Sequence, residues 1–408
     1  MRRLFLATVP LLLLTACTSS ATTQLTSSSR ATRPHTSRAH STHPTSTTPS
    51  SSSPSTPPTT ESTLTVPLAQ RIFNRMSLRQ RVGQLLMVDC PTTGVAGATI
   101  DAITQAHVGS VILDGTSTAG LQATSNVTGQ LQRLAPSNVR LFISTDQEGG
   151  LVQRLQGQGF TRIVSALQQG TIAPRQLRGF ARGWGDQLHA AGVNVNLAPV
   201  LDTVPANFGS NPPIGDLDRE FGHTPAVVTA HGVAVLRGML AAGVDPTVKH
   251  FPGLGRVRGN TDTTRGVTDS VTTRNDPYLA PFRAAVNAGT PFVMMSTAIY
   301  SRIDPGVPAA FSHTIVTGML RGDLGFQGVV ISDDLGGAAQ VSGTTVGQRA
   351  VRFIAAGGDM VLTVDATQAG RMTAALIAKA RANPAFKALV NAAALRVLRA
   401  KRARGLLR

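Results

Sequence analysis

A lysine and a histidine, Lys249 and His250, stand side by side at the end of an apolar stretch and directly before Phe251-Pro252-Gly253. Proline and glycine end strands, so this spacing predicts two polar side chains at a strand's end, held by a stiff turn. Lys249 offers three hydrogen-bond donors on a compact charge. The alternative is an ordinary solvated loop, but lysine is rare in this chain, which has only three others: Lys379, Lys387 and Lys401.

Acidic residues end two further apolar stretches. Asp146 precedes the pair Gly149-Gly150, and Arg154 follows soon after. An aspartate at a strand end can accept two hydrogen bonds from neighbouring hydroxyl groups of a ligand, and an arginine behind a glycine pair can reach back into the same pocket. Asp333 ends another stretch, where a carboxylate could act as a nucleophile. The alternative for Asp146 and Arg154 is a carboxylate in a turn and an arginine at the surface. The alternative for Asp333 and Asp334 is that both are helix N-caps. Of these two, we expect Asp334 to point away from the pocket and to cap the next helix.

The elements that must position these residues form a repeating theme from Pro67 onward. Short apolar runs end in polar residues or glycine, and each is followed by a helical stretch rich in Ala and Leu. Runs without clean alternation indicate strands buried on both faces of a parallel sheet. Eight such units predict an α/β fold, a single (β/α)8 barrel over residues 67–408, rather than a doubly wound open sheet. The runs are Gln84–Asp89, Ser110–Asp114, Leu141–Asp146, Val193–Val200, Pro246–His250, Pro291–Ser296, Gly328–Asp333 and Asp359–Val364.

An opening helix is predicted over Met76–Leu86, with Ser77 as its N-cap. This stretch and several others resemble motifs of family 3 glycoside hydrolases, most closely the small single-domain β-N-acetylglucosaminidases of that family. The resemblance covers nearly all of residues 67–408 and rests on separated motifs, which lie at Met76–Leu86, Thr145–Arg154, Asn194–Asp202, Lys249–Gly255, Leu320–Phe326 and Gly328–Leu335.

The resemblance implies a role for each candidate residue. Asp333 corresponds to the nucleophile of a retaining glycosidase, which traps the sugar as a covalent ester. The residues implied to hold the sugar are Asp146, Arg154, Arg219, Lys249 and His250. Arg219 follows Leu217-Asp218, which are inserted or shifted relative to the family pattern. The alternative to a sugar-binding role for Arg219 is therefore a salt bridge within its loop. Asp202 is expected to organise the loop that follows it, and Glu148 to brace a turn.

The second catalytic group departs from the family pattern. In the small N-acetylglucosaminidases, the motif that corresponds to Lys249–Gly255 is followed, after a gap of four residues, by Asp-(Ser/Thr)-His. At the same spacing this chain has Asn260-Thr261-Asp262. A carboxyl group can do the work of the missing histidine if its pKa is raised enough to hold a proton. We therefore predict that Asp262 is the general acid/base, with Asp269 and Asp245 as less favoured candidates.

Two consequences follow from this loop. A carboxylate repels phosphate, so an acidic acid/base favours hydrolysis over the phosphate-dependent cleavage that some family members perform.

The same loop is basic and rich in glycine. Its arginines could contact an anionic substrate such as a muropeptide or simply solvate the loop; they are Arg256, Arg258 and Arg265. Its glycines predict that the loop can move; they are Gly255, Gly259 and Gly266.

Composition narrows the possible partners. The formal charge is +17, and residues beyond 66 hold 33 basic and 20 acidic residues. A basic surface favours nucleic acid, an anionic membrane or an anionic wall polymer. Because the basic residues are dispersed and no nucleic-acid motif occurs, we favour an anionic envelope surface over nucleic acid. The nine histidines show no HExxH or paired-cysteine spacing, so we expect no metal and no cofactor.

The N-terminus resembles a bacterial lipoprotein precursor. Arg2-Arg3 precede an apolar run that ends near Leu14-Thr15-Ala16-Cys17, the layout of a signal peptide over residues 1–16 with Cys17 as the lipidated residue. Residues 17–66 are rich in Ser, Thr and Pro and are predicted to be a disordered linker. Ordinary secretion is the alternative. We expect an exported monomer held by lipid at the outer face of the cell membrane.

The sequence therefore predicts a retaining exo-β-N-acetylglucosaminidase that removes terminal GlcNAc from peptidoglycan fragments during wall recycling. A β-glucosidase or β-xylosidase of the same family is the second enzymatic interpretation. A wall-binding lipoprotein with a decayed catalytic loop is the interpretation from another class, and nucleic-acid binding conflicts with export.

Overall fold

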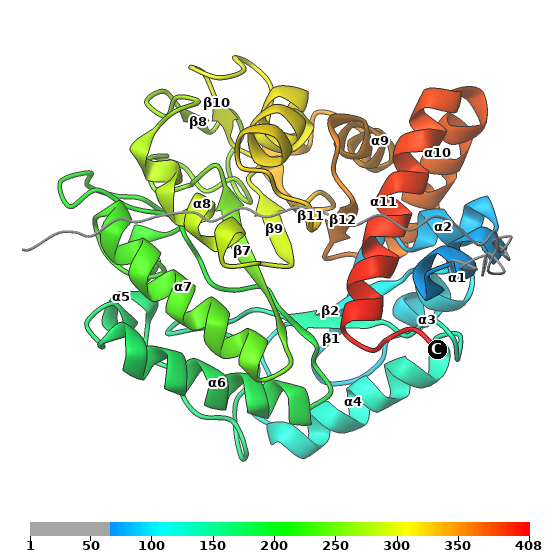
Figure 1. Ribbon diagram of the computed structural model, residues 1–408, viewed down its shortest axis with the longest axis horizontal. Coiled ribbons are helices and arrows are strands. Elements are labelled where there is room, and N and C mark those ends of the chain that lie inside the picture. Colours follow the sequence, from blue (N-terminus) through cyan, green and yellow to red (C-terminus); the bar gives the residue numbers. More distant parts are fainter. Residues whose placement is uncertain (1–65) are drawn as a thin grey trace, which may run out of the picture. The chain divides into compact units, whose positions relative to one another are not determined.

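A closed barrel of eight parallel strands forms the centre of the protein in the computed structural model, which describes residues 66–408 (Figure 1). The signal peptide, Cys17 and the linker up to residue 65 lie outside the described residues. Around the barrel the strands follow the order β1-β12-β11-β9-β7-β6-β3-β2. They are β1 (Leu86–Pro91), β2 (Ser110–Asp114), β3 (Phe142–Thr145), β6 (Val195–Asn196), β7 (Asp245–Phe251), β9 (Phe292–Met295), β11 (Val329–Asp334) and β12 (Met360–Thr363).

All eight predicted runs supply one barrel strand each, which confirms the predicted fold class. β1 closes the ring because Met87 pairs with Ser110 of β2 and Leu86 pairs with Val361 of β12. The doubly wound sheet is excluded, since an open sheet would leave two edge strands. Shorter pairs, which the sequence did not predict, lie outside the ring: β4 (Gln147–Gly149) with β5 (Val152–Gln153), and β8 (Thr268–Asp269) with β10 (Ile299–Tyr300).

Helices follow the strands and cover the outside of the ring (Figure 1). Among them, η4 is wound as a π-helix, and α5 (Ala166–Gln169) is a single turn within the long connection after β3. The covering helices are α3 (Gly97–Thr104), α4 (Gly120–Leu134), α6 (Pro174–Ala190), α7 (Pro225–Ala241), α8 (Ala280–Asn287), η4 (Thr314–Asp323), α9 (Val346–Ala356) and α10 (Ala369–Ala382).

The predicted opening helix is shorter than expected. Ser77 caps α2 (Leu78–Gly83) through a capping box with Gln80, which confirms the predicted N-cap. Leu86, however, is already the first residue of β1, because its apolar neighbours pair with the sheet rather than with the helix. A further helix, α1 (Leu68–Arg75), precedes α2.

Apolar side chains fill the ring from within and separate it from the helices. The interior cluster includes Met87, Phe142, Phe292 and Ile331, and two of the phenylalanine rings meet edge to face at 5.3 Å. Burial of such aromatic area supplies much of the stabilisation of a core of this kind. Cys90 is free and buried in the larger cluster between β1 and the helices.

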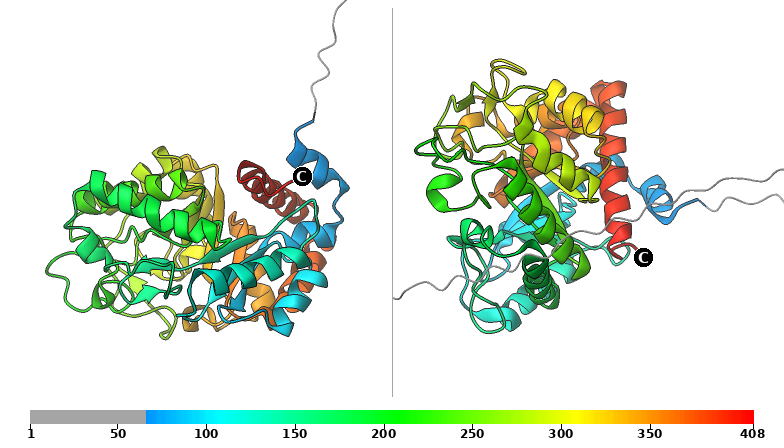
Figure 2. Two further views of the ribbon diagram at one scale, coloured as in Figure 1. Left: turned by 90° about the horizontal axis from the view of Figure 1, so that it is seen from below. Right: turned by 60° about the vertical axis from the view of Figure 1, so that its left-hand side comes forward.

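The last helix, α11 (Pro384–Ala403), crosses the end of the barrel where the strands begin. Lys401 donates to Gln84 Oε1 and to the carbonyl of Gly109, which precede β1 and β2. Arg396 pairs with Asp359, just before β12. α1 packs beside α11 at this end, through a cluster that joins Ala69 and Ile72 to Leu398 and Leu407 (Figure 2). No helix within residues 66–408 is both long and apolar enough to cross a bilayer.

Candidate active site

A pocket of about 500 Å³ opens at the other end of the barrel, where the strands finish. Side chains from seven of the eight barrel strands or the loops just after them line it, as expected for the carboxyl ends of a (β/α)8 barrel. The structure brings together in this pocket all seven residues that the sequence nominated: Asp146, Arg154, Arg219, Lys249, His250, Asp262 and Asp333.

A hairpin after β3 positions Asp146 and Arg154. β4 and β5 pair in antiparallel fashion, and the chain reverses between them through Gly149 and Gly150, whose φ angles of 110° and 57° suit glycine. The Arg154 backbone N–H donates to the Asp146 carbonyl at 3.2 Å, so both residues lie at the same edge of the pocket. The buried Nε of Arg154 has no hydrogen-bond partner among the described residues.

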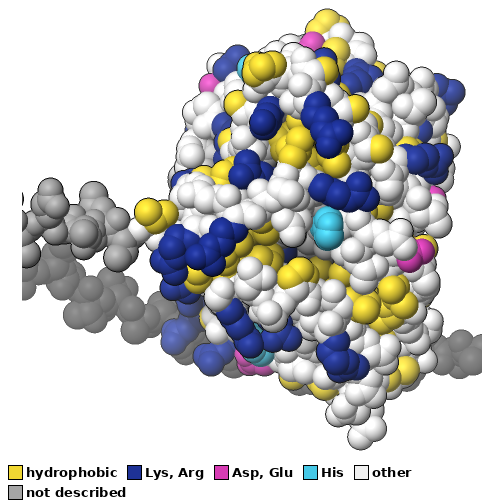
Figure 3. Space-filling view, turned by 90° about the vertical axis from the view of Figure 1, so that its right-hand side faces the viewer, with side chains coloured by type: hydrophobic (Ala, Val, Ile, Leu, Met, Phe, Trp, Pro, Cys, Tyr) yellow, Lys and Arg dark blue, Asp and Glu magenta, His cyan; other side chains and the backbone are white. Residues whose placement is uncertain are grey.

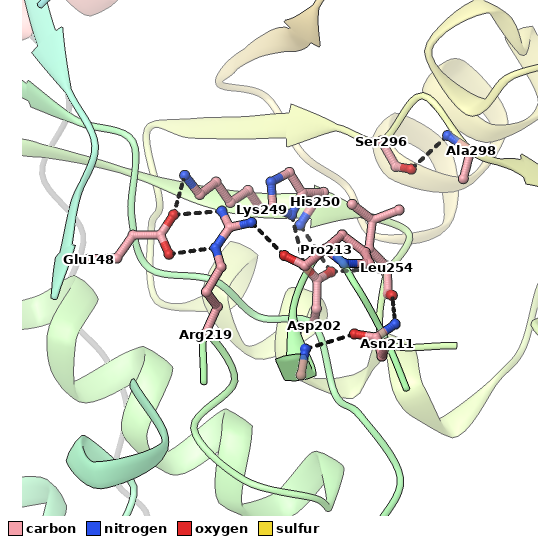
Figure 4. Close-up of polar contacts among 12 residues, drawn as sticks. Glu148, Asp202, Asn211, Pro213, Arg219, Lys249, His250, Leu254, Ser296 and Ala298 are labelled. Carbon is pink, nitrogen blue, oxygen red and sulfur yellow. Dashed lines mark hydrogen bonds and ion pairs between the residues drawn. The ribbon is translucent and has the colours of Figure 1, made fainter. Parts of the chain in front are cut away.

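Glu148 organises the floor of the pocket, a larger role than the predicted bracing of a turn (Figure 4). Its buried carboxylate accepts two hydrogen bonds from Arg219, at 2.8 and 2.7 Å, and lies 2.7 Å from Lys249 Nζ. Burial alone would raise the pKa of Glu148, but Arg219 and Lys249 outweigh it and hold the pKa well below its usual range. The residue is therefore negatively charged in the folded protein at neutral pH.

Lys249 is nearly fully buried and bridges two acids. Its Nζ donates to Asp146 Oδ1 at 2.5 Å in addition to its contact with Glu148. Burial opposes its charge, yet the two carboxylates raise its pKa above the ordinary value. Because an ammonium group has three donors, one remains for a ligand in the pocket.

Arg219 reaches the pocket from the loop around η1 (Gly215–Leu217) despite its shifted spacing. The residue before it, Asp218, adopts a left-handed conformation with φ 54°, which turns the chain inward. Arg219 Nη1 donates to the Pro213 carbonyl at 2.7 Å, and its other two bonded nitrogens go to Glu148. The loop salt bridge named as an alternative is thus present, and it forms part of the pocket floor.

Asp202 fixes His250 at the end of β7, rather than organising the loop that follows Asp202, as the sequence had predicted. The carboxylate accepts from the His250 backbone N–H at 3.1 Å and from the Leu254 N–H at 2.8 Å, and it lies 2.7 Å from His250 Nδ1. This last contact leaves Nε2 of His250 for the pocket. Gly255 allows the loops to approach closely, since a Cβ there would lie 1.9 Å from the Thr203 carbonyl oxygen.

Asn211 ties two pocket loops together, a role that the sequence did not reveal. Its side-chain amide donates to the carbonyls of Leu254 and Val257 and accepts from the Gly215 N–H, all within 2.9 Å (Figure 4). The loop that carries Arg219 is therefore joined to the loop that leads to Asp262.

Asp262 faces the same pocket as Asp333, from the loop after β7. Asn260, which replaces the family's aspartate, accepts the Asp262 backbone N–H at 2.9 Å and so shapes the turn. Asp262 is open to the pocket, but the surrounding protein reduces its hydration. This desolvation and then the charge of Asp333 raise the pKa of Asp262 to about 6, while His250 acts in the opposite direction. An acid with this pKa can hold and release a proton near neutral pH.

The segment after β11 clamps the Asp262 loop. The carbonyls of Thr261 and Asp262 accept from the backbone N–H groups of Gln340 and Ala339. The Gln340 side chain also accepts from the Val267 N–H at 2.9 Å and donates to its carbonyl at 3.1 Å. These four hydrogen bonds link the loop of Asp262 to the segment that follows Asp333.

Several residues weighed on the sequence lie elsewhere. Asp245 begins β7 at the opposite end of the barrel and pairs with Arg404. Asp269 is buried and accepts from Val271, Thr272 and the Thr272 hydroxyl, outside the pocket lining. Both are thereby separated from Asp333, and Asp262 is the one acid/base candidate of the three in the pocket.

The expectation that Asp334 caps the next helix was wrong. Its carboxylate accepts from Gly336, Gly337 and Val364, and it also lines the pocket, whereas Thr345 caps α9. Gly336 and Gly337, which follow β11 after Leu335, present their N–H groups to Asp334 before any helix begins.

Arg256 has an internal role rather than a position in the pocket. It lies 2.8 Å from Asp276, donates to Thr272 and stacks over Tyr278 at 4.1 Å. Arg258 lies over Phe208 at 4.5 Å. Neither guanidinium lines the pocket.

A small cavity behind the pocket floor is lined by Glu148, Arg219 and Trp184. Trp184 stacks on Phe180 at 6.4 Å along α6 and is half-buried. The cavity places this indole ring behind the carboxylate and guanidinium that form the pocket floor.

Comparison with known proteins identifies the family. Residues 77–400 match the description "Glycosyl hydrolase family 3 N terminal domain". The chain belongs to glycosyl hydrolase family 3. This family 3 domain is thus a glycoside hydrolase, as predicted.

Solved structures resemble it closely. A crystal structure of a β-N-acetylhexosaminidase from Beutenbergia cavernae DSM 12333 is 49% identical with a TM-score of 0.79, and the match covers 81% of this chain and 99% of that one. A family 3 β-N-acetylglucosaminidase from Paenibacillus sp. str. FPU-7 is 33% identical with a TM-score of 0.75, covering 81% of this chain and 63% of that one. A β-hexosaminidase of Stenotrophomonas maltophilia (strain R551-3) is 33% identical over 282 residues, 66% of this chain and 81% of the relative.

Proposed function

We propose that this family 3 hydrolase is a retaining exo-β-N-acetylhexosaminidase that removes terminal GlcNAc. The observation that carries the proposal is the pairing of two carboxyl groups in one strand-end pocket, with the pKa of Asp262 raised to about 6 partly by the charge of Asp333. A retaining glycosidase needs one ionised carboxylate and one protonated carboxyl group across the scissile bond. The choice of GlcNAc as the sugar is supported by the similar proteins, which are a β-N-acetylhexosaminidase, a β-N-acetylglucosaminidase and a β-hexosaminidase.

In the first half of the proposed reaction the Asp333 carboxylate attacks the anomeric carbon and forms a glycosyl ester. The bond to the leaving oxygen breaks, and that oxygen takes the proton of Asp262. In the second half the Asp262 carboxylate removes a proton from water. The water oxygen bonds to the anomeric carbon, and the Asp333 carboxylate leaves.

The remaining pocket residues hold the terminal sugar in this proposal. Asp146 and Lys249 present an acceptor and a donor next to each other, suited to neighbouring hydroxyl groups. The imidazole of His250, oriented by Asp202, and the guanidinium of Arg154 add two further contacts. Arg219 shapes the floor of the pocket while its charge is neutralised by Glu148.

The nucleophile can be identified directly. A 2-fluoro glycoside should trap the glycosyl ester, and mapping of the labelled peptide should place the label on Asp333. Asp333→Ala should lose turnover by on the order of 10⁴-fold while substrate binding remains. A label on another acid, or full turnover by Asp333→Ala, would refute the assignment. A panel of nitrophenyl glycosides tests the sugar: faster release from β-glucoside or β-xyloside than from β-GlcNAc would replace the proposed specificity.

We further propose that the natural substrate is a GlcNAc-terminated peptidoglycan fragment and that the protein works outside the cell, anchored through lipidated Cys17. The proposal rests on the signal-peptide layout of residues 1–17. Labelling of cells with a radioactive fatty acid should mark the parent protein and not Cys17→Ser. Equal labelling of both proteins, or none of either, would exclude the anchor.

A further inference from the structure

The helix that closes the strand-start end of the barrel belongs to a part of the chain with an unusual charge distribution. Residues 66–88 and 366–408 contain 14 Lys and Arg and no Asp or Glu. They form α1, α2, α10 and α11, which lie together on one side of the domain (Figure 1). Figure 3 shows this side, where basic side chains greatly outnumber acidic ones.

Some of these charges are used inside the protein. Lys401 is fully buried, and Arg396 and Arg404 pair with Asp359 and Asp245 at the strand starts. The exposed charges of α1, α11 and the residues after α11 form a separate set, which we call the basic face. Its members are Arg71, Arg75, Lys387, Arg399, Arg402 and Arg408.

Arg71 is the one member of the basic face whose side chain forms a hydrogen bond within the described residues, to the Val66 carbonyl. Within the described residues, the side chains of Arg75, Lys387, Arg399 and Arg402 form no hydrogen bond, ion pair or aromatic contact. These four side chains are not held in place by a contact within the described residues. Their charged ends are therefore available to bind a partner. No carboxylate of α1 or α11 repels an anion from them, because neither helix contains one.

We propose that the basic face binds an anionic lipid surface. Juxtamembrane basic residues are each attracted to an anionic leaflet, and their contributions accumulate over a face of this kind. Leu389 and Val66 are exposed among the basic residues, at 40% and 46%, and supply the apolar contacts that interfacial helices make with the acyl boundary.

Two observations favour lipid over single-stranded nucleic acid as the partner. Nucleic-acid surfaces of that type stack bases on exposed aromatic rings. Among residues 66–408 the one large exposed aromatic side chain is Phe180, which lies on α6 and not on the basic face. In addition, the 65 residues that precede Val66 join the domain at α1, so the N-terminal segment with its apolar run leaves from this same face.

The position of the face has a functional consequence. α11 lies across the strand starts, and the pocket opens at the strand ends, so a docked molecule would keep its pocket turned away from the lipid. Docking through the basic face therefore leaves the pocket accessible to soluble glycosides.

The experiment compares two variants of the full chain that lose the same charge. One carries Arg75→Gln, Lys387→Gln, Arg399→Gln and Arg402→Gln. The matched control carries Arg162→Gln, Arg175→Gln, Arg178→Gln and Arg237→Gln, four exposed arginines of α6, α7 and the loop before α5 that also lack partners within the described residues. Both proteins keep the same N-terminal segment, so any binding by that segment cancels.

Co-sedimentation with phosphatidylcholine vesicles, with and without phosphatidylglycerol, measures the increment in binding due to anionic lipid. In the basic-face variant this increment should be at least about 20-fold smaller than in the parent protein. In the control variant it should lie within threefold of the parent's value. Turnover of a soluble aryl glycoside should be equal in all three proteins. Equal losses in the two variants, or no loss in either, would overturn the proposal. Displacement from the vesicles by soluble polyphosphate at a matched phosphate concentration would assign the face to a polymer instead.

Discussion

Glu148 and Arg219, 71 residues apart in the chain, share two hydrogen bonds of 2.8 and 2.7 Å in the floor of the pocket. The same carboxylate contacts Lys249, so one buried acid neutralises two bases. Removal of one partner from a buried charge cluster leaves the others without compensation. The geometry of Arg219 and Lys249 therefore depends on a residue that need not touch the substrate.

Glu148→Gln should test this dependence. We expect a loss of about 3–5 kcal/mol in the free energy of unfolding at pH 7 and at least a 100-fold lower kcat/KM, because two buried cations lose their counter-charge. Since the pKa of Glu148 is depressed in the folded state, its contribution is present above the unfolded value of 4.5 and is lost as the pH falls below it. Denaturant titrations from pH 3 to 7 should show a smaller pH dependence for the variant; parallel curves would contradict the assignment.

The raised pKa of Asp262 predicts a pH profile. As a general acid it must be protonated, so kcat/KM should fall as the pH rises through about 6. In Asp262→Asn this alkaline limb should disappear, and kcat/KM for substrates with poor leaving groups should drop by on the order of 10³-fold. A dinitrophenyl glycoside, whose leaving group needs no proton, should lose far less. An unchanged limb in the variant would exclude Asp262 as the acid.

The clamp formed by Gln340 predicts a positioning effect. Gln340→Ala should lower kcat/KM about tenfold for poor leaving groups and little for a dinitrophenyl glycoside, because the acid loses its placement rather than its chemistry. Gln132→Ala is the matched control, since Gln132 likewise bonds both the N–H and the carbonyl of one residue, Leu141, away from the pocket. Both variants should lose about 1–3 kcal/mol of stability. Equal activity loss on both substrates would reduce Gln340 to a structural residue.

The acid/base also bears on the choice between water and phosphate. A carboxylate at position 262 repels an incoming phosphate, and an imidazole would not. Asp262→His should therefore cleave a nitrophenyl β-GlcNAc faster when phosphate is added and form a sugar phosphate, whereas the parent should not respond. Product analysis by mass spectrometry at constant ionic strength would decide this, and identical responses would refute the repulsion argument.

Lys401 predicts a pH effect on stability far from the pocket. Burial lowers its pKa to about 7, so the folded protein binds fewer protons than the unfolded chain between pH 7 and the ordinary lysine value of 10.5. Stability from this group should rise with pH across that window, by up to about 1.4 kcal/mol per pH unit. Lys401→Met should lack this rise in denaturant titrations from pH 6 to 9. The same slope in both proteins would contradict the prediction.

The fold could be predicted from the sequence because each barrel strand is an uninterrupted apolar run with a polar end. A ring of parallel strands brings all those ends to one rim, so Asp146, Lys249 and Asp333 needed no long-range information to be grouped. The contacts between loops could not be predicted in this way. Asn211 and Gln340 bond backbone atoms more than 40 residues away, and polar residues in loops carry no periodicity that would reveal their partners. Asp334 was misassigned because the glycines after it offered closer N–H groups than a helix did.

Trp184 gives the protein a built-in optical reporter. It is the chain's single tryptophan, and it lines the cavity behind Glu148 and Arg219. Indole emission responds to nearby charge and hydration, so a sugar that shifts the arginine should change the fluorescence of the unlabelled enzyme. Occupancy of the pocket thereby becomes measurable in real time, even in variants too slow to turn over.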